Sequence, residues 1–237
     1  METINYLLGY ENLKIYQNDE MFKFSLDSVL LSHFVSLSLK KCKILDIGTG
    51  NAVIPILLTT KTSNKIDAVE IQKEVYDLGK KSIELNGLED QISIYNQDIK
   101  DYASNLESDI YDTITCNPPF FKSMKENISE YKQIARHEKT LKLEDIFEIA
   151  KKLLKNNGNI AIVHRPERLI DIITSMKNNN IEPKKIRFIY PKKNKPSNMI
   201  LIEGTKNGKS GVKILEPLYI YNEDGTYTKE VSEYLKN

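Results

Sequence analysis

Short apolar runs alternate with segments of helical periodicity along most of this chain. KILDIG at 43–48 and KIDAVE at 65–70 are typical of buried strands, and helical spacing follows each of them. Because parallel strands need crossover connections that helices usually supply, this alternation predicts a doubly wound α/β sheet covered on both faces. We predict strands at 43–48, 65–70, 92–98, 111–116, 159–164, 185–190 and 199–204, and helices at 51–60, 72–86, 143–158 (ending on Gly158 as its cap) and 166–179.

The last two predicted strands are joined by a basic loop instead of a helix, which favours antiparallel pairing. The expected fold is therefore a seven-stranded, mostly parallel sheet with an antiparallel last hairpin. A length of 237 residues fits one large domain. We expect a single domain over 1–237, with an N-terminal extension at 1–40 and the sheet with its basic C-terminal part at 41–237.

The composition excludes several classes of protein. Apolar residues make up 40% of the chain and charged residues 28%, and the formal net charge is +1, as in ordinary globular proteins. No apolar run is long enough to span a bilayer, and the N-terminus lacks the pattern of a signal peptide. Cys42 and Cys116 lie far apart and suggest neither a disulfide scaffold nor a metal cluster. We therefore expect a cytoplasmic protein without a membrane partner or a metal.

Polar residues and glycines gather where the predicted strands end. The first strand runs into Asp46-Ile47-Gly48-Thr49-Gly50-Asn51, and two glycines let the backbone turn tightly and approach a ligand. A dinucleotide fingerprint would place a third glycine at position 53, where this chain has Val53. Glu70 ends the second strand and can accept hydrogen bonds from ribose hydroxyls. Asp98 ends the third strand and can accept from an adenine amino group.

An adenosine ligand without a pyrophosphate fits S-adenosylmethionine, with Asp46 near its positively charged methionine end. The separate features have simpler explanations: a GxG can be a tight turn, and acidic residues at strand ends are often helix N-caps. Their joint occurrence at successive strand ends favours a cofactor site of the methyltransferase type.

The fourth strand ends in Asn117-Pro118-Pro119-Phe120, which is an unusual corner. The side-chain oxygen of Asn117 and the carbonyl of Pro118 can accept from the two N–H bonds of an exocyclic amino group. The prolines fix the direction of the corner by locking φ, and Phe120 offers a face on which a base can stack. A purely structural turn would explain the prolines but not the asparagine and the aromatic residue.

These motifs together resemble the class I S-adenosylmethionine-dependent methyltransferases that modify planar amino or amide nitrogens. The segment 22–34, the segment from Ala135 and the basic C-terminal part resemble more closely the bacterial tRNA adenine-N6 methyltransferases that act on the adenosine 3′ of the anticodon in valine tRNA. The resemblance implies a Rossmann-like fold, tRNA as substrate and S-adenosylhomocysteine as product. It assigns the cofactor to Asp46, Gly48, Gly50, Asn51, Glu70, Asp98 and Asn117, with Phe24 and Asp27 of the N-terminal extension closing over it, and the adenine to Asn117, Pro118, Pro119 and Phe120.

A basic stretch near the C-terminus is the candidate RNA-binding surface. Between 184 and 213 nine basic residues are opposed only by Glu203, as phosphate binding requires. We expect RNA contacts from Lys192, Lys193 and Lys195 in the loop between the last two strands, and from Arg136 and His137 after the NPPF corner. A solvated lysine surface is the alternative. No obligate protein partner is evident.

Three other functions share parts of this pattern. Protein glutamine-N5 methyltransferases also use an NPP-aromatic corner, typically with tyrosine, where this chain has Phe120. DNA adenine-N6 methylation would need a target-recognition domain, and the sequence shows none. A non-catalytic RNA-binding module with this fold is the third, although the intact Asn117 and glycine loop argue against lost catalysis.

Overall fold

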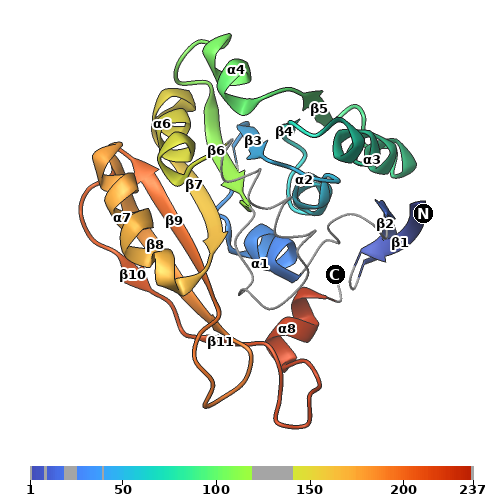
Figure 1. Cartoon of the computed structure of the whole chain (residues 1–237), viewed down its shortest axis with the longest axis vertical. Coiled ribbons are helices and arrows are strands. Elements are labelled where there is room, and N and C mark those ends of the chain that lie inside the picture. Colours follow the sequence, from blue (N-terminus) through green and yellow to red (C-terminus); the bar gives the residue numbers. More distant parts are fainter. Residues whose placement is uncertain (1, 8–9, 19–25, 39, 119–140, 236–237) are drawn as a thin grey trace, which may run out of the picture.

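The computed structural model describes residues 2–7, 10–18, 26–38, 40–118 and 141–235. The predicted site residues Phe24, Pro119, Phe120, Arg136 and His137 lie outside these ranges. Figure 1 shows the arrangement of the helices and strands.

The central sheet has the strand order β10-β8-β9-β7-β6-β3-β4-β5, and β11 pairs with β8. Strands β3 (Lys43–Ile47), β4 (Lys65–Glu70), β5 (Ile92–Asn96), β6 (Tyr111–Cys116) and β7 (Leu154–His164) are parallel. Strand β9 (Met199–Lys206) runs antiparallel to both β7 and β8 (Ile181–Tyr190). The predicted mostly parallel sheet with an antiparallel last hairpin is confirmed. Two short edge strands, β10 (Lys213–Ile214) and β11 (Leu218–Tyr219), extend the seven predicted strands to nine.

Two hydrophobic clusters cover opposite faces of this sheet, because neighbouring residues of a strand point to opposite sides. Ile44 packs with the cluster that includes α1 (Leu26–Phe34), α2 (Val53–Thr59) and part of α3 (Lys73–Leu85). Leu45 packs with the cluster that includes α4 (Ile99–Ser104), α6 (Leu143–Leu153) and α7 (Leu169–Asn178). A short helical turn, η1 (Pro166–Arg168), precedes α7, and α8 (Lys229–Tyr234) follows the last strand.

The predicted helix at 143–158 is wrong in its C-terminal part. Helix α6 ends at Leu153 and β7 begins at Leu154, whose backbone is already extended and whose side chain is fully buried. Gly158 is therefore a strand residue and not a helix cap. A Cβ atom there would lie 3.0 Å from the carbonyl oxygen of Asp112, so close packing of β7 against its neighbour explains this glycine.

The N-terminal residues form a hairpin that the sequence did not predict. Strands β1 (Glu2–Leu7) and β2 (Tyr10–Asn18) pair antiparallel as a separate two-stranded sheet. Strand β2 lies against α3: the Tyr16 N–H donates to Ser82 Oγ at 2.9 Å, and the Lys14 N–H donates to Asn86 Oδ1 at 3.0 Å.

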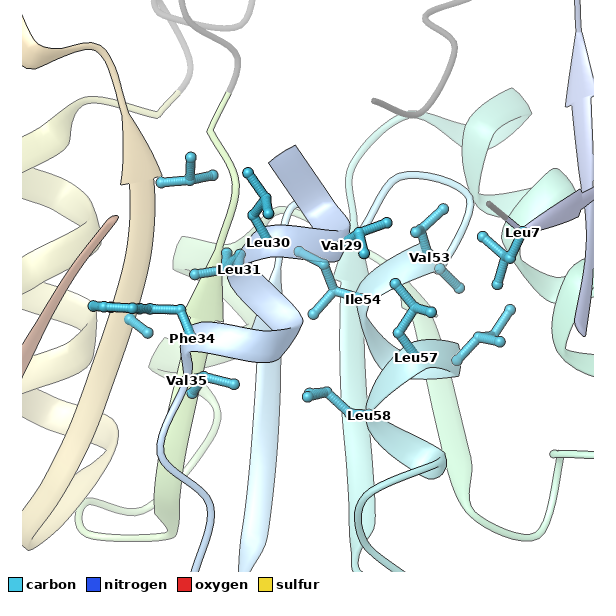
Figure 2. Packing of buried hydrophobic residues seen from close by; sticks show 14 of the residues in the cluster. Leu7, Val29, Leu30, Leu31, Phe34, Val35, Val53, Ile54, Leu57 and Leu58 are labelled. Atoms are coloured by element: carbon cyan, nitrogen blue, oxygen red, sulfur yellow. The ribbon is translucent and has the colours of Figure 1, made fainter. Parts of the chain in front are cut away.

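Helix α1 packs on α2 through buried aliphatic side chains. Figure 2 shows Val29 of α1 beside Ile54 of α2. We propose from these contacts, and from those of the hairpin with α3, that residues 1–40 and 41–237 fold as one domain.

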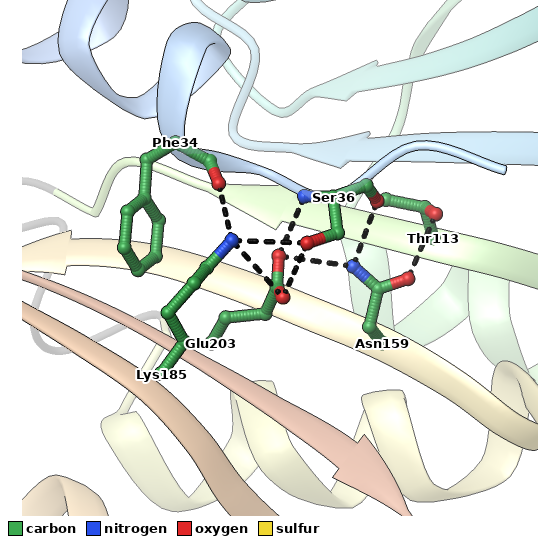
Figure 3. Close-up of polar contacts among 6 residues, drawn as sticks. All are labelled: Phe34, Ser36, Thr113, Asn159, Lys185 and Glu203. Atoms are coloured by element: carbon green, nitrogen blue, oxygen red, sulfur yellow. Dashed lines mark hydrogen bonds and ion pairs between the residues drawn. The ribbon is translucent and has the colours of Figure 1, made fainter. Parts of the chain in front are cut away.

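A polar network around the buried carboxylate of Glu203 holds the C-terminal end of α1 to the sheet (Figure 3). The Glu203 carboxylate of β9 accepts from the Ser36 N–H at 2.6 Å and the Ser36 hydroxyl at 2.8 Å. It also accepts from Asn159 Nδ2 at 3.2 Å and pairs with Lys185 Nζ at 3.3 Å. Glu203 is thus the one acid of the basic C-terminal stretch, and it has a structural role.

Candidate active site

The site lies at the edge of the sheet where the parallel strands end. In the registers of β3 with its two neighbours, Asp46 is opposite Ala68 of β4 and Thr115 of β6. The loop after β3 therefore lies between Glu70, the last residue of β4, and Asn117, the first residue after β6. Ligands of doubly wound sheets bind in the crevice outside these carboxyl ends.

The loop after β3 adopts a conformation that needs its glycines. Gly48 and Gly50 have φ values of 64° and 61°, in the left-handed region that residues with a Cβ atom rarely adopt. A Cβ atom on either glycine would meet no atom of the described residues within 4 Å. The loop thus exposes its backbone to open space, as close approach of a ligand requires.

Glu70 holds this loop in place. Its side chain is buried, and its two carboxylate oxygens accept from the Gly50 N–H and the Gln72 N–H, both at 2.9 Å. A carboxylate has about four lone-pair sites in all. The remaining ones can accept from ribose hydroxyls, so the predicted cofactor contact is compatible with the structural role.

Asp46 is buried beneath the loop with an unsatisfied oxygen. Its Oδ1 accepts from the Thr115 hydroxyl at 2.6 Å, whereas Asp46 Oδ2 and Thr49 Oγ1 are buried without a hydrogen-bond partner in the described part of the chain. Burial raises the pKa of Asp46 to about 7, the Thr115 hydroxyl and, more weakly, the nearby Thr49 hydroxyl oppose this, and neighbouring Glu70 adds to it. A donor-rich ligand fits these orphaned atoms.

Two other predicted cofactor residues have contacts within the protein. Asp98 is the N-cap of α4, where its Oδ1 accepts from the Lys100 N–H at 2.8 Å. Strand β5 ends at Asn96, two residues before it. Asn51 donates its side-chain amide to the Tyr16 carbonyl at 3.1 Å and so ties the loop to the N-terminal hairpin. Their contacts with a cofactor stay predictions.

The corner after β6 is held by the first turn of α1. The side-chain amide of Asn117 donates from Nδ2 to Ser28 Oγ at 3.1 Å, and Ser28 is buried. Because Nδ2 faces Ser28, the Oδ1 atom points the other way and remains an acceptor. Asp27, a predicted cofactor residue, lies beside Ser28 in the same turn.

Two positioning residues escaped the sequence analysis. Ser28 adjoins the predicted cofactor residue Asp27, but no sequence signal singled out the serine itself. Gly79 lies inside α3, and a Cβ atom there would approach the Gly50 carbonyl oxygen to 3.0 Å and Ile94 Cδ1 to 2.8 Å. A lone glycine inside a helical pattern often has such a packing reason, and that signal could have found Gly79.

The candidate RNA-binding lysines lie in the β8–β9 loop. Lys192 is half-buried and donates to the Glu223 carbonyl at 3.2 Å, whereas Lys193 and Lys195 are exposed. Three other basic residues of the stretch form ion pairs with acids of the protein: Lys185 with Glu203, Arg187 with Glu230, and Lys206 with Asp109. The basic surface is therefore smaller than the sequence suggested.

Two searches for other kinds of site found nothing in the ranges described. No group of histidine, cysteine, aspartate or glutamate side chains there could hold a metal ion. None of the helices that the structure describes is long and apolar enough to cross a membrane.

Comparison with known proteins identifies the family. The family model described as methyltransferase small domain matches residues 24–179, which is more than half of the chain. The chain belongs to the methyltransferase small domain family. The match contains the glycine loop, Glu70, Asp98 and the NPPF corner, so the predicted enzyme class is confirmed. Family membership also supports S-adenosylmethionine as the cofactor of this methyltransferase.

Curated relatives of this methyltransferase carry the name tRNA1(Val) (adenine(37)-N6)-methyltransferase. The one from Flavobacterium psychrophilum is 25% identical over 94% of this chain and 95% of its own. The one from Christiangramia forsetii is 28% identical over 96% and 95%, and the one from Trichodesmium erythraeum 31% over 67% of each. The predicted resemblance to this group is confirmed.

Solved structures show the same fold at low sequence identity. A predicted O-methyltransferase from Agrobacterium tumefaciens has a TM-score of 0.71 at 18% identity and covers 89% of this methyltransferase and 95% of its own chain. A ribosomal protein L11 methylase from Lactobacillus delbrueckii subsp. bulgaricus has a TM-score of 0.56 at 14% identity, with 84% of each chain covered. At these identities the likeness establishes the class I fold alone.

Proposed function

We propose that this methyltransferase transfers a methyl group from S-adenosylmethionine to the exocyclic N6 of an adenosine in tRNA. The adenosine 3′ of the anticodon of valine tRNA is the proposed target, following the names of its relatives. The observation that carries the proposal is the Asn117 side chain, which Ser28 orients at the carboxyl end of β6. A tRNA substrate implies a cytoplasmic location.

The corner after β6 would prepare the amino group for attack. The adenine N6 is a poor nucleophile because its lone pair is delocalised into the ring. Asn117 Oδ1 and the Pro118 carbonyl can each accept one of its N–H bonds, which favours a pyramidal nitrogen with an available lone pair. When bound, S-adenosylmethionine supplies an electrophilic methyl group. The contribution of the protein is orientation and hydrogen bonding, with no covalent enzyme intermediate.

The cofactor would lie over the loop after β3. Glu70 has acceptor capacity left for ribose hydroxyls, and Asp46 and Thr49 offer oxygens without partners. The Asn51 contact with the Tyr16 carbonyl supports the proposal that residues 1–40 lie over this site.

His164, at the end of β7, is not assigned as a general base. Burial lowers its pKa to about 4, and its Nδ1 accepts from the Arg165 N–H at 2.8 Å. The ring is therefore neutral near pH 7. Water can take the amino proton, which becomes acidic only once methylation has begun.

The test is methyl transfer from labelled S-adenosylmethionine to unmodified total tRNA, with nucleoside analysis of the product. We expect N6-methyladenosine at a single anticodon-loop position. Asn117→Ala should lower kcat by roughly a hundredfold or more, as loss of one preorganised polar group in an active site does, while cofactor binding persists. Asn178→Ala is the matched control, because Asn178 is exposed at the end of α7.

The same assay separates the alternatives. A different methylated base in tRNA would refute the proposed role of Asn117. Labelling of protein or DNA instead of tRNA would favour glutamine-N5 or DNA adenine-N6 methylation. Binding of tRNA without turnover on any substrate would favour a non-catalytic module.

A further inference from the structure

Four tyrosines gather at the C-terminal edge of the sheet, outside the proposed active site. Tyr190 ends β8, Tyr219 lies opposite it in the register with β11, and Tyr221 and Tyr227 form an isolated antiparallel bridge just beyond. Tyr219, Tyr221 and Tyr227 are 37%, 36% and 36% exposed, and Tyr190 is half-buried. We call these four residues the tyrosine platform.

Successive side chains of a strand point to opposite faces, and this sets the direction of Tyr219 and Tyr221. Leu218 and Ile220 point into the core, so Tyr219 and Tyr221 between and after them point to solvent. The rings form two pairs: Tyr190 with Tyr219 at a centroid distance of 5.4 Å, and Tyr221 with Tyr227 at 5.2 Å and an interplanar angle of 18°. Single exposed aromatics are common on protein surfaces, but a group of paired rings is informative.

Hydrogen bonds hold the turn that carries the platform. The Asn222 N–H donates to the Thr226 carbonyl at 2.8 Å, and the Gly225 N–H to the Asn222 carbonyl at 3.1 Å. The Thr228 hydroxyl donates to the Tyr219 carbonyl at 2.7 Å. The rings are therefore presented from an ordered backbone, which lowers the entropy cost of stacking a ligand on them.

The platform faces the same edge of the sheet as the active site. Strand β9 runs antiparallel to β7 and β8 antiparallel to β9, so Tyr190 lies at the edge where β7 ends. Figure 1 shows the β8–β9 loop and the turn after β11 on the side toward which the β6 and β7 arrows point. A substrate that enters the corner after β6 can therefore extend toward the platform.

Charged side chains of both signs lie beside the platform, and two exposed lysines form no ion pair with the residues that the structure describes. The turn carries Glu223 and Asp224. Lys192 donates a hydrogen bond to the Glu223 carbonyl. The Thr226 hydrogen bonds lower the pKa of Asp224 most, and the charge of Lys192 lowers it further. Lys193 and Lys195 are exposed and have no ion-pair partner among the residues that the structure describes. They can approach phosphates that run past the rings.

We propose that the tyrosine platform stacks unpaired nucleotides of the tRNA substrate, with Lys193 and Lys195 on the adjoining phosphates. The proposal rests on the proposed function and extends it by naming a binding surface outside the corner after β6. Aromatic faces stack any base, and phosphate contacts add affinity without sequence information. Paired RNA keeps its bases inside the helix, so the platform selects loops.

The test measures the dissociation constant of the full-length protein for an unmodified valine tRNA transcript and for fully paired RNA, with S-adenosylhomocysteine present. Tyr219→Ser with Tyr221→Ser should weaken tRNA binding about tenfold or more, as loss of base stacking does, and change paired-RNA binding less than about twofold. Tyr219→Phe with Tyr221→Phe keeps the ring faces and should bind like the wild type. Tyr95→Ser is the matched control and should bind like the wild type, because Tyr95 is 38% exposed, pairs with the ring of Tyr102 and lies on β5, at the other end of the strand order.

The contribution of Lys193 and Lys195 is tested separately, by the salt dependence of tRNA binding. Lys193→Ser with Lys195→Ser should lower the slope of log K against log salt by about 1.4, as expected for two single-strand phosphate contacts. Lys41→Ser with Lys151→Ser removes the same charge from exposed positions at the opposite edge and should leave the slope unchanged.

Two results would overturn the platform while leaving the proposed function intact. One is a folded Tyr219→Ser/Tyr221→Ser protein that binds and methylates tRNA like the wild type. The other is a Tyr219→Ser/Tyr221→Ser protein whose binding of paired RNA is weakened as much as its binding of tRNA. Conversely, tyrosine-dependent tRNA binding by a wild type that forms no N6-methyladenosine would support the platform and refute the proposed function.

Discussion

Glu203→Gln should destabilise the protein by releasing the end of α1 from the sheet. The carboxylate receives two hydrogen bonds from Ser36, one from Asn159 and an ion pair from Lys185. Glutamine has nearly the same size and keeps one oxygen, so the change removes the charge without leaving a cavity. In the least costly orientation the new NH₂ group faces the Ser36 hydroxyl and Lys185.

The size of the loss in unfolding free energy depends on the hydrogen-bond partners that Lys185 keeps. Breaking a buried ion pair costs about 3–5 kcal/mol when the remaining charge has no other partner. Lys185 is 21% exposed and still donates to the Phe34 carbonyl at 2.7 Å, so its loss is smaller. The Ser36 N–H and Asn159 keep an acceptor, but a neutral one, and hydrogen bonds to neutral groups are weaker by about 1 kcal/mol. We expect a loss of about 3 kcal/mol in the free energy of unfolding, or ~6–12 °C in Tm for a chain of this length.

Urea unfolding and thermal melts of the two proteins measure this loss. Glu107→Gln is the matched control, since Glu107 is exposed and should change stability by less than about 0.5 kcal/mol. Lys185→Met combined with Glu203→Gln should cost less than the sum of the single changes, because the two side chains interact. A Glu203→Gln protein within about 1 kcal/mol of the wild type, or strict additivity in the cycle, would refute the reasoning.

Three further predictions concern the site. The raised pKa of Asp46 means that, between pH about 4 and about 7, the folded state holds a proton that the unfolded chain has lost. The Asp46 contribution to stability should therefore fall as the pH rises from 5 to 7, whereas His33 and His164, whose pKa values burial lowers to about 4, contribute in the opposite direction. The test is the difference in urea midpoint between wild type and Asp46→Asn, which should move against the wild type from pH 5 to 7; a difference that does not change with pH would contradict this. Gly79→Ala improves helix propensity by about 1 kcal/mol, but its Cβ atom would press on the Gly50 carbonyl oxygen. Calorimetry should therefore show that S-adenosylhomocysteine binds several-fold more weakly, and an unchanged affinity would count against the contact. Ser28→Ala removes the acceptor of the Asn117 amide and should lower kcat for tRNA about tenfold with little change in KM, whereas an unchanged kcat would show that Asn117 is oriented by other means.

The sequence predicted the elements best where local patterns are strong. The strands at 43–48, 65–70 and 111–116 agree with β3, β4 and β6 to within a residue or so, because each is a short apolar run followed by a turn signal. The helix at 143–158 failed because Leu154 is equally compatible with a helix face and a buried strand. The hairpin β1–β2 was missed because its exposed residues break the alternation of a strand.

Some features of the candidate site could likewise be predicted from the sequence, and others could not. The sequence alone identified Gly48 and Gly50, since a turn with positive φ leaves little choice of residue. It also identified Asn117 as an unusual end for a buried strand. It could not show that Glu70 accepts a hydrogen bond from the loop, or that Asp98 caps a helix. A carboxylate at a strand end can bind a ligand or accept from the backbone, and the sequence does not distinguish the two.

What the sequence by itself determined is the order of strands and helices, the glycine loop and the asparagine-proline corner, because these depend on interactions between residues close together in the chain. Only the tertiary structure decided the strand order, the contact of Ser28 with Asn117, the approach of Gly79 to the loop and the burial of Glu203 against Ser36. The paired residues in these contacts are 29 to 167 positions apart. No local pattern records such pairings, since each exists only once packing of the whole sheet has brought its two sides together.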